Sequence, residues 1–232
     1  MKKILVFTAT YNEKENIKKL ITLIFKHYSN AHVLIIDDNS PDKTAEEIEL
    51  LKKEFKNISL IKRESKLGLD TAHKFAYKYA LEKGYDYLIT MDADLSHDPA
   101  ELTNFISNLE TYPFVIGSRY APGGKCLMKG RRLLMSKYGN ILIKLVLRIN
   151  CNEFTTSYRG FDLKKLGSFN LDTVKASGYS FFMKTIFEIS KRKIEIKEIP
   201  ITFKDRSQGY SKLPKIEIFR TLLNLFLLIL KK

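Results

Sequence analysis

Two aspartates, Asp92 and Asp94, are the residues of this sequence best suited to chemistry, and they follow the apolar run Tyr87-Leu-Ile-Thr-Met91. Residues two apart at the end of an extended strand point to the same side, so both carboxylates can reach one hard cation such as Mg²⁺ or Mn²⁺. Asp98-Pro99 comes next, and a capping residue before a first-turn proline predicts that a helix begins there. The alternative is that two surface aspartates simply end a strand.

Polar residues also follow two other apolar runs. Thr10-Tyr-Asn-Glu13 comes after Ile4-Leu-Val-Phe7, and Asp37-Asp-Asn-Ser40 comes after His32-Val-Leu-Ile-Ile36. Continuous apolar runs of this length are typical of strands buried on both faces. The carboxyl ends of parallel strands meet at one edge of a sheet, where open α/β sheets bind ligands. We therefore expect the three polar segments to share one crevice.

Within that crevice, Tyr11 and Asp38 are candidates for holding a nucleoside. Tyr11 can stack on a ring, and Asp38 can accept hydrogen bonds from the N–H groups of a heterocycle. The alternatives are a packing tyrosine and a helix cap. The sequence contains neither GxGxxG nor a P-loop lysine motif, so a dinucleotide fingerprint or a P-loop is not supported. A cation on Asp92 and Asp94 that bridges a diphosphate would neutralise a departing nucleotide instead.

The alternation of strand-like and helical segments predicts the fold class. Apolar residues recur at helical spacing over 17–28, after Asn12-Glu-Lys-Glu15, which resembles a capping box. Further helices are predicted from Ser40-Pro41 to Glu54 and from Thr71 to Lys83, and further strands over 58–61 and 85–91. Such alternation predicts an α/β fold, with a mostly parallel central sheet covered by helices on both faces.

Composition sets the bounds. The chain has 232 residues, 44% of them hydrophobic, which suits one domain with a substantial core. Its 40 Lys+Arg against 26 Asp+Glu give a formal charge of +14, which favours nucleic acid, anionic lipid or phosphorylated substrates as partners. The two cysteines, Cys126 and Cys151, have no metal-ligand spacing around them, which fits a reducing compartment. No small-residue cleavage site follows the first strand, so we expect a cytoplasmic protein without a signal peptide.

The second half combines apolar and cationic residues. Cations interrupt the mainly apolar segment from Met128 to Ile149, a mixture that suits a helix near anionic lipid headgroups; the alternative is an amphipathic helix with solvated cations. Gly178 to Lys191 reads as a helix and Ile194 to Phe203 as a strand. The loop from Lys204 to Lys212 is cationic, so it can close over a diphosphate or remain solvated.

The C-terminal tail is the most apolar part of the chain. Its run from Ile216 to Leu230 falls short of the roughly 20 residues that a membrane-spanning helix needs. Two alternatives remain, a helix in the membrane interface with lysines at the headgroups, or a helix that binds another protein, such as a membrane-anchoring partner. The basic charge favours the interface. We therefore divide the chain into a catalytic domain, 1–213, and a C-terminal apolar helix, 214–232.

Together these motifs resemble the dolichol-phosphate mannose synthases, which are inverting family 2 glycosyltransferases of GT-A fold. The resemblance spans nearly the whole chain and lies in Thr10-Tyr-Asn-Glu13, Asp37-Asp-Asn-Ser-Pro41, Asp92-Ala-Asp-Leu-Ser-His97, Gly117-Ser-Arg-Tyr120 and Phe203-Lys-Asp-Arg-Ser-Gln-Gly-Tyr-Ser-Lys-Leu213. The first two motifs are common across family 2, whereas the other three are more specific to polyprenyl-phosphate transferases. In two places the chain departs from the family: Ala9 replaces a common proline, and Asp70 interrupts a Gly-Leu-Gly pattern.

The resemblance implies transfer of a hexose, mannose from GDP-mannose, to a dolichyl or polyprenyl phosphate at the cytoplasmic face of a membrane, with Mg²⁺ or Mn²⁺ as cofactor. It implies that Asp92, Asp94 and Arg119 are catalytic. The nucleotide-sugar donor would be held by Tyr11, Glu13, Asp38, Asp92, Arg119, Arg206 and Lys212. The metal would be held by Asp92, Asp94 and Ser96, and the acceptor phosphate by Arg132 and Ser136.

The chemistry of the acceptor bears on what the site must contain. A phosphate monoester has a second pKa of about 6, so at neutral pH it is already a nucleophile and needs no general base. Alternatives are a family 2 transferase that uses a UDP-sugar or a saccharide acceptor, and a non-catalytic basic protein that binds membranes or nucleic acid. The aspartate pair beside cationic loops argues against the last, so we do not expect nucleic acid as a partner.

Overall fold

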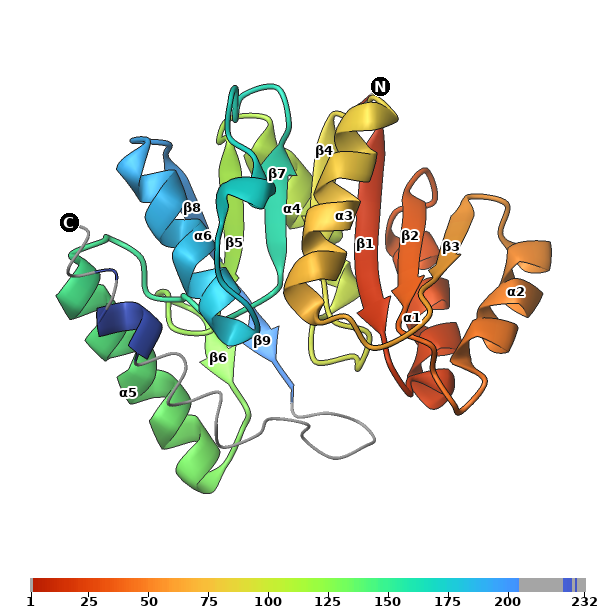
Figure 1. Ribbon diagram of the computed structural model, residues 1–232, viewed down its shortest axis with the longest axis horizontal. Helices are drawn as coiled ribbons and strands as arrows, with labels where there is room; N and C mark the ends of the chain where they lie inside the picture. The colour runs from red at the N-terminus through yellow and green to blue at the C-terminus, as the bar shows by residue number, and fades with distance from the viewer. Residues whose placement is uncertain (1, 205–222, 227, 229–232) are drawn as a thin grey trace.

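A mostly parallel sheet forms the centre of the protein (Figure 1). The structure is a computed structural model that describes residues 2–204, 223–226 and 228. Within this part the strand order is β3-β2-β1-β4-β7-β5-β8, and a two-stranded sheet pairs β6 with β9. The strands are β1 (Ile4–Thr10), β2 (His32–Asp37), β3 (Ile58–Lys62), β4 (Tyr87–Thr90), β5 (Phe114–Ser118), β6 (Lys125–Cys126), β7 (Arg159–Asp162), β8 (Ile196–Pro200) and β9 (Thr202–Phe203).

Among the described strands of the large sheet, only β7 runs against its neighbours, pairing antiparallel with β4 and β5. The other pairings in that sheet are parallel. The helices are α1 (Lys14–His27), α2 (Thr44–Glu54), α3 (Leu69–Glu82), α4 (Leu102–Leu109), α5 (Gly130–Leu147) and α6 (Tyr179–Lys191), with short 3₁₀ helices η1 (Pro99–Glu101) and η2 (Leu171–Thr173). The predicted α/β class and mostly parallel sheet are confirmed.

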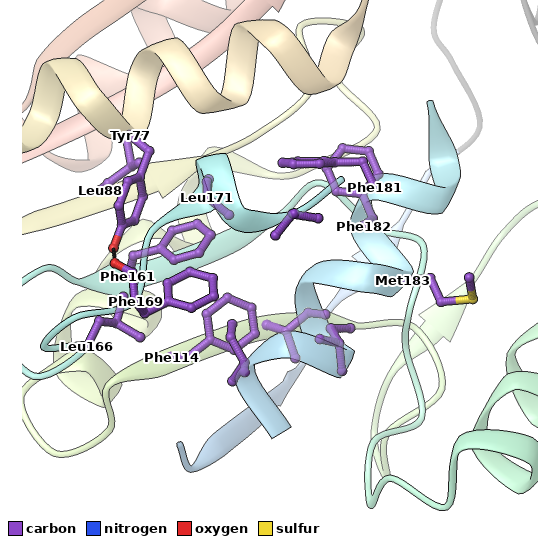
Figure 2. Close-up of a cluster of buried hydrophobic side chains, with 14 of the residues drawn as sticks. Tyr77, Leu88, Phe114, Phe161, Leu166, Phe169, Leu171, Phe181, Phe182 and Met183 are labelled. Carbon is purple, nitrogen blue, oxygen red and sulfur yellow. Dashed lines mark hydrogen bonds between the residues drawn. The ribbon is translucent and has the colours of Figure 1, made fainter. Parts of the chain in front are cut away.

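The buried strands divide their side chains between two cores. Ile4 and Val6 of β1 pack with α1, α2 and α4 on one face, whereas Leu5 and Phe7 pack with α3 and α6 on the other (Figure 1). This alternation follows from the period of two along a strand. The second core is rich in aromatic rings from α3, β5, β7 and α6, and the hydroxyl of Tyr77 there donates to the carbonyl of Phe169 at 3.0 Å (Figure 2).

The predicted capping box of the first helix and the predicted start of the second helix are wrong. The first helix begins after Glu13 without any side-chain cap, and Asn12 has φ 59°, so no capping box forms. The second begins at Thr44 rather than at Ser40-Pro41. The cause is the Asp37 carboxylate, which accepts hydrogen bonds from the Ser40 amide (2.9 Å) and hydroxyl (2.6 Å). Such local bonds hold the backbone in a turn and compete with helix formation.

The apolar segment of the second half forms α5, as predicted. Of the tail, helical residues 223–226 and 228 are described, and the rest of the predicted C-terminal helix lies outside the described residues. Leu225 and Leu228 are buried in the core that α3 and α6 share, and the Asn224 amide donates to the Ser180 hydroxyl at 3.1 Å. In the described part of the chain, no helix is long and apolar enough to cross a membrane.

Candidate active site

The aspartate pair lies on a turn directly after β4, as predicted. The Asp92 side chain is 34% exposed, whereas Asp94 is buried. Asp98 caps the 3₁₀ helix that follows, because its carboxylate accepts the Ala100 amide at 3.1 Å. This confirms the predicted helix start. The turn therefore presents one accessible carboxylate and one that is largely enclosed.

Hydrogen bonds fix the shape of this aspartate turn. The Oδ1 of Asp94 accepts from both the amide (3.1 Å) and the hydroxyl (2.6 Å) of Ser96, while Leu95 between them adopts a left-handed φ of 63°. The Asp92 amide donates to Nδ1 of His97 at 3.0 Å, so this ring is neutral and carries its proton on Nε2. Burial lowers the pKa of His97, which favours the neutral form.

One short segment, Thr155-Thr-Ser157, connects the aspartate turn to Arg119. The Thr155 hydroxyl accepts from Nη2 of Arg119 at 2.9 Å. The Thr156 hydroxyl contacts Nε2 of His97 at 3.2 Å, and the Ser157 hydroxyl donates to Oδ1 of Asp92 at 2.5 Å. Arg159, two residues beyond Ser157, is buried and donates to the backbone carbonyls of Thr156 and Phe182, so its role is structural. The segment therefore fixes the aspartate turn and the arginine relative to each other.

Arg119 is paired with an acid that the sequence analysis missed. Its guanidinium donates to both oxygens of the fully buried Glu153, at 2.7 and 2.8 Å. Burial would raise the pKa of Glu153, but the guanidinium and the hydrogen bonds from Thr155 hold that pKa below its usual value. Nothing in the sequence marks a lone loop glutamate for this role. Arg119 is thus a positioned cation whose charge is largely balanced.

The two residues predicted to hold a nucleoside, Tyr11 and Asp38, are contacted by cationic side chains from the segment after β3. The sequence analysis did not predict these contacts. Asp38 is buried, and its Oδ1 alone contacts both Nε and Nη2 of Arg63, which also donates to the Gly68 carbonyl at 3.1 Å. Burial raises the pKa of Asp38, and the Arg63 pair opposes that rise only in part. The ammonium group of Lys66 lies 4.3 Å from the centre of the Tyr11 ring. A nucleoside bound at Tyr11 and Asp38, as predicted, would contact or displace these two cations.

The first two polar loops are joined, as the shared crevice requires. The Thr10 hydroxyl donates to Oδ1 of Asp37 at 2.8 Å, and the Glu13 amide donates to the Thr44 hydroxyl at 3.0 Å. Glu13 itself accepts from the side-chain amide of Asn16 at 2.8 Å. The aspartate turn follows β4, and the first polar loop follows β1. Because β4 and β1 are paired in parallel, the turn and the loop leave neighbouring strands at the same edge of the sheet. The predicted grouping of these three segments along neighbouring strand ends is confirmed.

The predicted acceptor residues lie on α5. Arg132 is exposed, and Ser136, one turn later, is half-buried. The Tyr120 hydroxyl donates to the Ser136 hydroxyl at 2.8 Å, which ties α5 to the residue that follows Arg119. Arg206 and Lys212, predicted to contact the donor phosphates, lie outside the described residues.

The donor set suits a hard divalent cation that a ligand helps to hold. Among the described residues, no group of three or more His, Cys, Asp or Glu side chains is placed to bind a metal. Asp92 and Asp94 supply carboxylate oxygens, and Ser96 is fully buried with its hydroxyl directed at Asp94, so it orients that carboxylate. Mg²⁺ and similar ions use one or two carboxylates together with substrate phosphates, which this turn matches.

Comparison with known proteins gives the family. Residues 5–169 match glycosyl transferase family 2. An undecaprenyl-phosphate mannosyltransferase from Micrococcus luteus is 32% identical over 212 residues, which are 91% of this chain and 87% of that protein. A polyprenol monophosphomannose synthase from Mycolicibacterium smegmatis is 33% identical over 214 residues, 90% of this chain and 80% of that protein. Both matches extend well beyond the aspartate turn.

Solved structures share the fold at lower identity. Glucosyl-3-phosphoglycerate synthase from Mycobacterium tuberculosis, in complex with Mn²⁺, UDP and phosphoglyceric acid, has a TM-score of 0.69 at 15% identity, covering 99% of this chain and 78% of that one. A mannosyltransferase from Pyrobaculum calidifontis, in complex with GDP-Man and Mn²⁺, has a TM-score of 0.62 at 18% identity, covering 99% and 64%. With the family match and the two sequence relatives, these findings confirm the resemblance seen in the motifs. The chain belongs to glycosyl transferase family 2 and is a glycosyltransferase of GT-A fold.

Proposed function

We propose that this glycosyltransferase transfers mannose from GDP-mannose to a polyprenyl or dolichyl phosphate, with inversion at the anomeric carbon and with Mg²⁺ or Mn²⁺. The names of the two sequence relatives, a mannosyltransferase and a phosphomannose synthase acting on polyprenyl compounds, support the sugar and the acceptor. The observation that carries the proposal is the segment Thr155-Thr-Ser157, which joins the aspartate turn to a positioned arginine. Joining two phosphate-bearing substrates requires such an arrangement.

The acceptor needs no activation by a base. With a second pKa of about 6, its phosphate monoester is mostly a dianion at neutral pH. A phosphate oxygen forms the new bond to the anomeric carbon while the bond from that carbon to the β-phosphate oxygen breaks, and its electron pair leaves with GDP. No proton has to be removed. A divalent cation on Asp92 and Asp94 would neutralise charge on the diphosphate.

The residues of the chain bind and orient the two anions. We assign Tyr11, Glu13 and Asp38 to the nucleoside. Asp92, Asp94 and Arg119 belong to the reaction centre, with Ser96 oriented behind the second aspartate. We assign Arg206 and Lys212 to the donor phosphates, and Arg132 and Ser136 to the acceptor phosphate.

The exposed face of α5 supports binding at a membrane surface. Six large apolar side chains of this helix are more than two-fifths exposed: Leu134, Met135, Tyr138, Ile141, Leu142 and Leu145. Basic residues flank them, as in helices that lie in the interface of an anionic membrane. We propose that the catalytic domain, 1–213, is peripheral at the cytoplasmic face of a membrane. In the C-terminal segment, 214–232, Leu225 and Leu228 pack in the protein's own core, and the exposed Leu223 and Phe226 are the side chains that would enter the membrane or contact an anchoring protein.

Sugar transfer into lipid tests the proposal. Purified protein is incubated with Mn²⁺, polyprenyl phosphate and one donor labelled in its sugar: GDP-mannose, UDP-glucose or UDP-N-acetylglucosamine. We expect labelled sugar in the organic phase only when GDP-mannose is the donor. Label from a UDP-sugar would overturn the donor, and label in an added saccharide would overturn the acceptor. If no donor labels lipid or saccharide, the proposed function is wrong.

A further inference from the structure

The protein binds the guanidinium of Arg119 along one edge only. Nε and Nη2 donate to Glu153 at 2.7 and 2.8 Å, and Nη2 also donates to the Thr155 hydroxyl at 2.9 Å. A guanidinium has one N–H on Nε and two on each terminal nitrogen, so these hydrogen bonds use every N–H of Nε and Nη2. Among the described residues, no acceptor takes an N–H of Nη1. Nη1 is therefore the nitrogen that remains for a ligand.

A pocket borders this guanidinium. It lies between α5 and the loop that follows β5, its volume is about 310 Å³, and its lining includes Arg119, Lys137 and Lys144. Arg119 is buried, with 7% of its surface exposed, and Glu153 is fully buried. Since Nε and Nη2 are turned to Glu153, Nη1 is the nitrogen that can meet a ligand in the pocket.

Glu153 is itself held in place. Its carboxylate accepts hydrogen bonds from the amide and the hydroxyl of Thr155, at 3.1 and 3.0 Å. The amide of the next residue, Phe154, donates to Oδ1 of Asn140 on α5 at 2.7 Å. Glu153 therefore lies on a segment that is fixed to α5, and its side chain can hold Arg119 in one orientation.

Two aromatic rings limit the tilt of the same guanidinium. The ring centres of Phe203 and Tyr120 lie 4.8 and 5.3 Å from Cζ of Arg119, distances at which a cation and a ring attract each other. Glu153 fixes the rotation of the guanidinium in its own plane, and the rings fix the plane. The protein itself thus sets the direction of the Nη1 N–H groups.

The ion pair also balances charge. Burial would raise the pKa of Glu153, but the charge of Arg119 and the hydrogen bonds from Thr155 hold that pKa below its usual value, so the acid is ionised. A cation and an anion in contact largely cancel at longer distance, whereas an N–H group still attracts an acceptor at hydrogen-bond distance. Replacing a buried ion pair by apolar residues is often neutral or stabilising, so stability alone does not explain this pair.

We propose that Glu153 is a positioning residue that acts through Arg119. It holds Nε and Nη2 and balances their charge, so that Arg119 stabilises the leaving diphosphate as a directed donor, through the two N–H groups of Nη1, rather than as a free countercharge. This inference rests on the proposed function and deepens it. Donors that are fixed in advance stabilise developing charge without a cost of reorganisation. The buried acid thus contributes to the reaction without touching a substrate.

Kinetics of Glu153→Gln separate direction from charge. Glutamine keeps the size of the side chain, but its amide N–H₂ group opposes one N–H of Arg119, so the two-point contact breaks and the positive charge is left unbalanced. We expect kcat to fall about 10²-fold, as for the loss of one donor to a developing oxyanion, with the GDP-mannose KM within about threefold of wild type. A free countercharge would give the opposite result, a lower KM with an undiminished kcat, and that result would overturn the inference.

Thr155→Val tests direction without any change of charge. It removes the hydroxyl that accepts from Nη2 of Arg119 and donates to Glu153. We expect kcat to fall about tenfold, since a hydrogen bond to a charged group is lost. Two exposed sites provide controls that should behave as wild type: Thr22→Val, on α1, matches the lost hydroxyl, and Glu195→Gln, before β8, matches the lost charge. An unchanged kcat in Thr155→Val, or an equal fall in its control, would overturn the inference.

Nitrogen NMR of the arginine side chains tests the orientation without any reaction. The guanidinium signals of Arg119 are identified by their loss in Arg119→Lys. In wild type without substrates, the two Nη signals should be resolved, because the ion pair hinders rotation about the Cζ–N bonds. In Glu153→Gln they should merge. Magnesium pyrophosphate, a diphosphate without base or sugar, should shift the Nη1 signal of wild type and leave the Nε signal unchanged.

The outcomes are distinct. Resolved Nη signals in Glu153→Gln, or a shift of Nε instead of Nη1 with pyrophosphate, would overturn the role of Glu153. If wild type transfers no sugar to any prenyl phosphate, the proposed function fails. In that case NMR alone decides the inference: merged signals in the variant together with a shift of Nη1 by pyrophosphate support it, and any other pattern overturns it.

Discussion

The aspartate turn and helix α5 both border Arg119, yet they are built in opposite ways. In the turn, the carboxylates of Asp92 and Asp94 and the ring of His97 are each fixed by hydrogen bonds within the protein. On α5, most exposed side chains are apolar, and Lys137 in its pocket has no ion-pair partner among the described residues. The side chains of the turn are held by hydrogen bonds within the chain, whereas the large apolar side chains of α5 are exposed.

This difference indicates a division of work. Preorganised polar groups cost little to reorganise when charge develops, so the turn suits the bond-breaking side of the reaction. An exposed apolar helix with basic residues suits a lipid substrate or a membrane. Substitutions in the turn should therefore impair chemistry and stability, and substitutions on α5 should impair acceptor and membrane binding.

The largest effect is expected for Asp94→Asn. It removes one negative charge from the pair proposed to bind the cation, and we expect kcat to fall about 10³-fold because stabilisation of the leaving diphosphate is lost. Mn²⁺-dependent binding of GDP, measured by calorimetry, should disappear as well. The exposed Asp172→Asn is the control and should behave as wild type. If Asp94→Asn still binds GDP in an Mn²⁺-dependent way, the assignment of this aspartate pair to the metal site is wrong.

Glu153→Ala tests whether the reaction side depends on its buried ion pair. The substitution leaves the Arg119 guanidinium without its partner, which should lower the free energy of unfolding by about 3 kcal/mol. Urea unfolding measures this. The double variant Arg119→Met/Glu153→Met, which removes both charges, should be more stable than Glu153→Ala. If the double variant is the less stable one, the unpaired charge is not the cause.

Ser157→Ala examines the support of the accessible aspartate. The variant loses the hydroxyl that donates to Oδ1 of Asp92 at 2.5 Å. Partners of metal-binding carboxylates typically matter by tenfold or more, so we expect the Mn²⁺ concentration for half-maximal activity to rise about tenfold. Ser107→Ala, at an exposed hydroxyl on α4, is the matched control. An unchanged Mn²⁺ requirement would reduce the Ser157 bond to a packing contact.

The turn and α5 also differ in what their sequence revealed. Alternation of apolar runs and helical spacing was enough to predict the parallel sheet, because burial on both faces leaves a strong pattern. Asp92 and Asp94 could be found because both lie within one short motif. Glu153 and Arg63 could not, since each is distant in sequence from the residue that it contacts, and only the fold brings the partners together.

The predicted start of the second helix was wrong for a related reason. The Ser40-Pro41 pair carries a strong local signal for a cap, but the Asp37 carboxylate binds the Ser40 amide and hydroxyl and keeps the segment in a turn. On α5 the composition predicted a helix with basic residues among apolar ones. It did not reveal that Lys137 and Lys144 share a pocket with Arg119, because the other wall comes from the loop after β5.

Leu145→Glu sharpens the comparison from the side of α5. This leucine is 68% exposed, and its transfer from water into a lipid interface is worth roughly 1.5–3 kcal/mol. We expect at least about tenfold weaker binding to vesicles that contain anionic lipid, measured by cosedimentation. Leu50→Glu is the matched control, because that leucine is 55% exposed on α2. Equal losses in both variants would show that α5 is not the membrane-facing element.

The smallest expected effect on stability comes from the contact between the aspartate turn and Lys204, the residue that follows β9. The Lys204 amide donates to the Ser96 carbonyl at 3.2 Å, and its ammonium group pairs with Asp98 at 2.9 Å. Burial would raise the pKa of Asp98, but the bonds from Lys204 and from the Ala100 amide outweigh it and lower that pKa. The ion pair between Lys204 and Asp98 therefore stabilises the fold at pH values above 3.8, the pKa of Asp98 in the unfolded state. This contribution is lost as the pH falls through the lower pKa of Asp98 in the folded state.

Lys204→Met should accordingly lower Tm by about one or two degrees at pH 7, since an exposed ion pair contributes little. The difference from wild type should shrink as pH falls below 3.8, because Asp98 becomes protonated in both proteins. Thermal unfolding between pH 7 and pH 3 measures this, with the exposed Lys53→Met as the control for loss of charge. A Tm difference that stays constant with pH would assign the effect of Lys204 to packing, and the ion pair would then contribute nothing to fixing the turn.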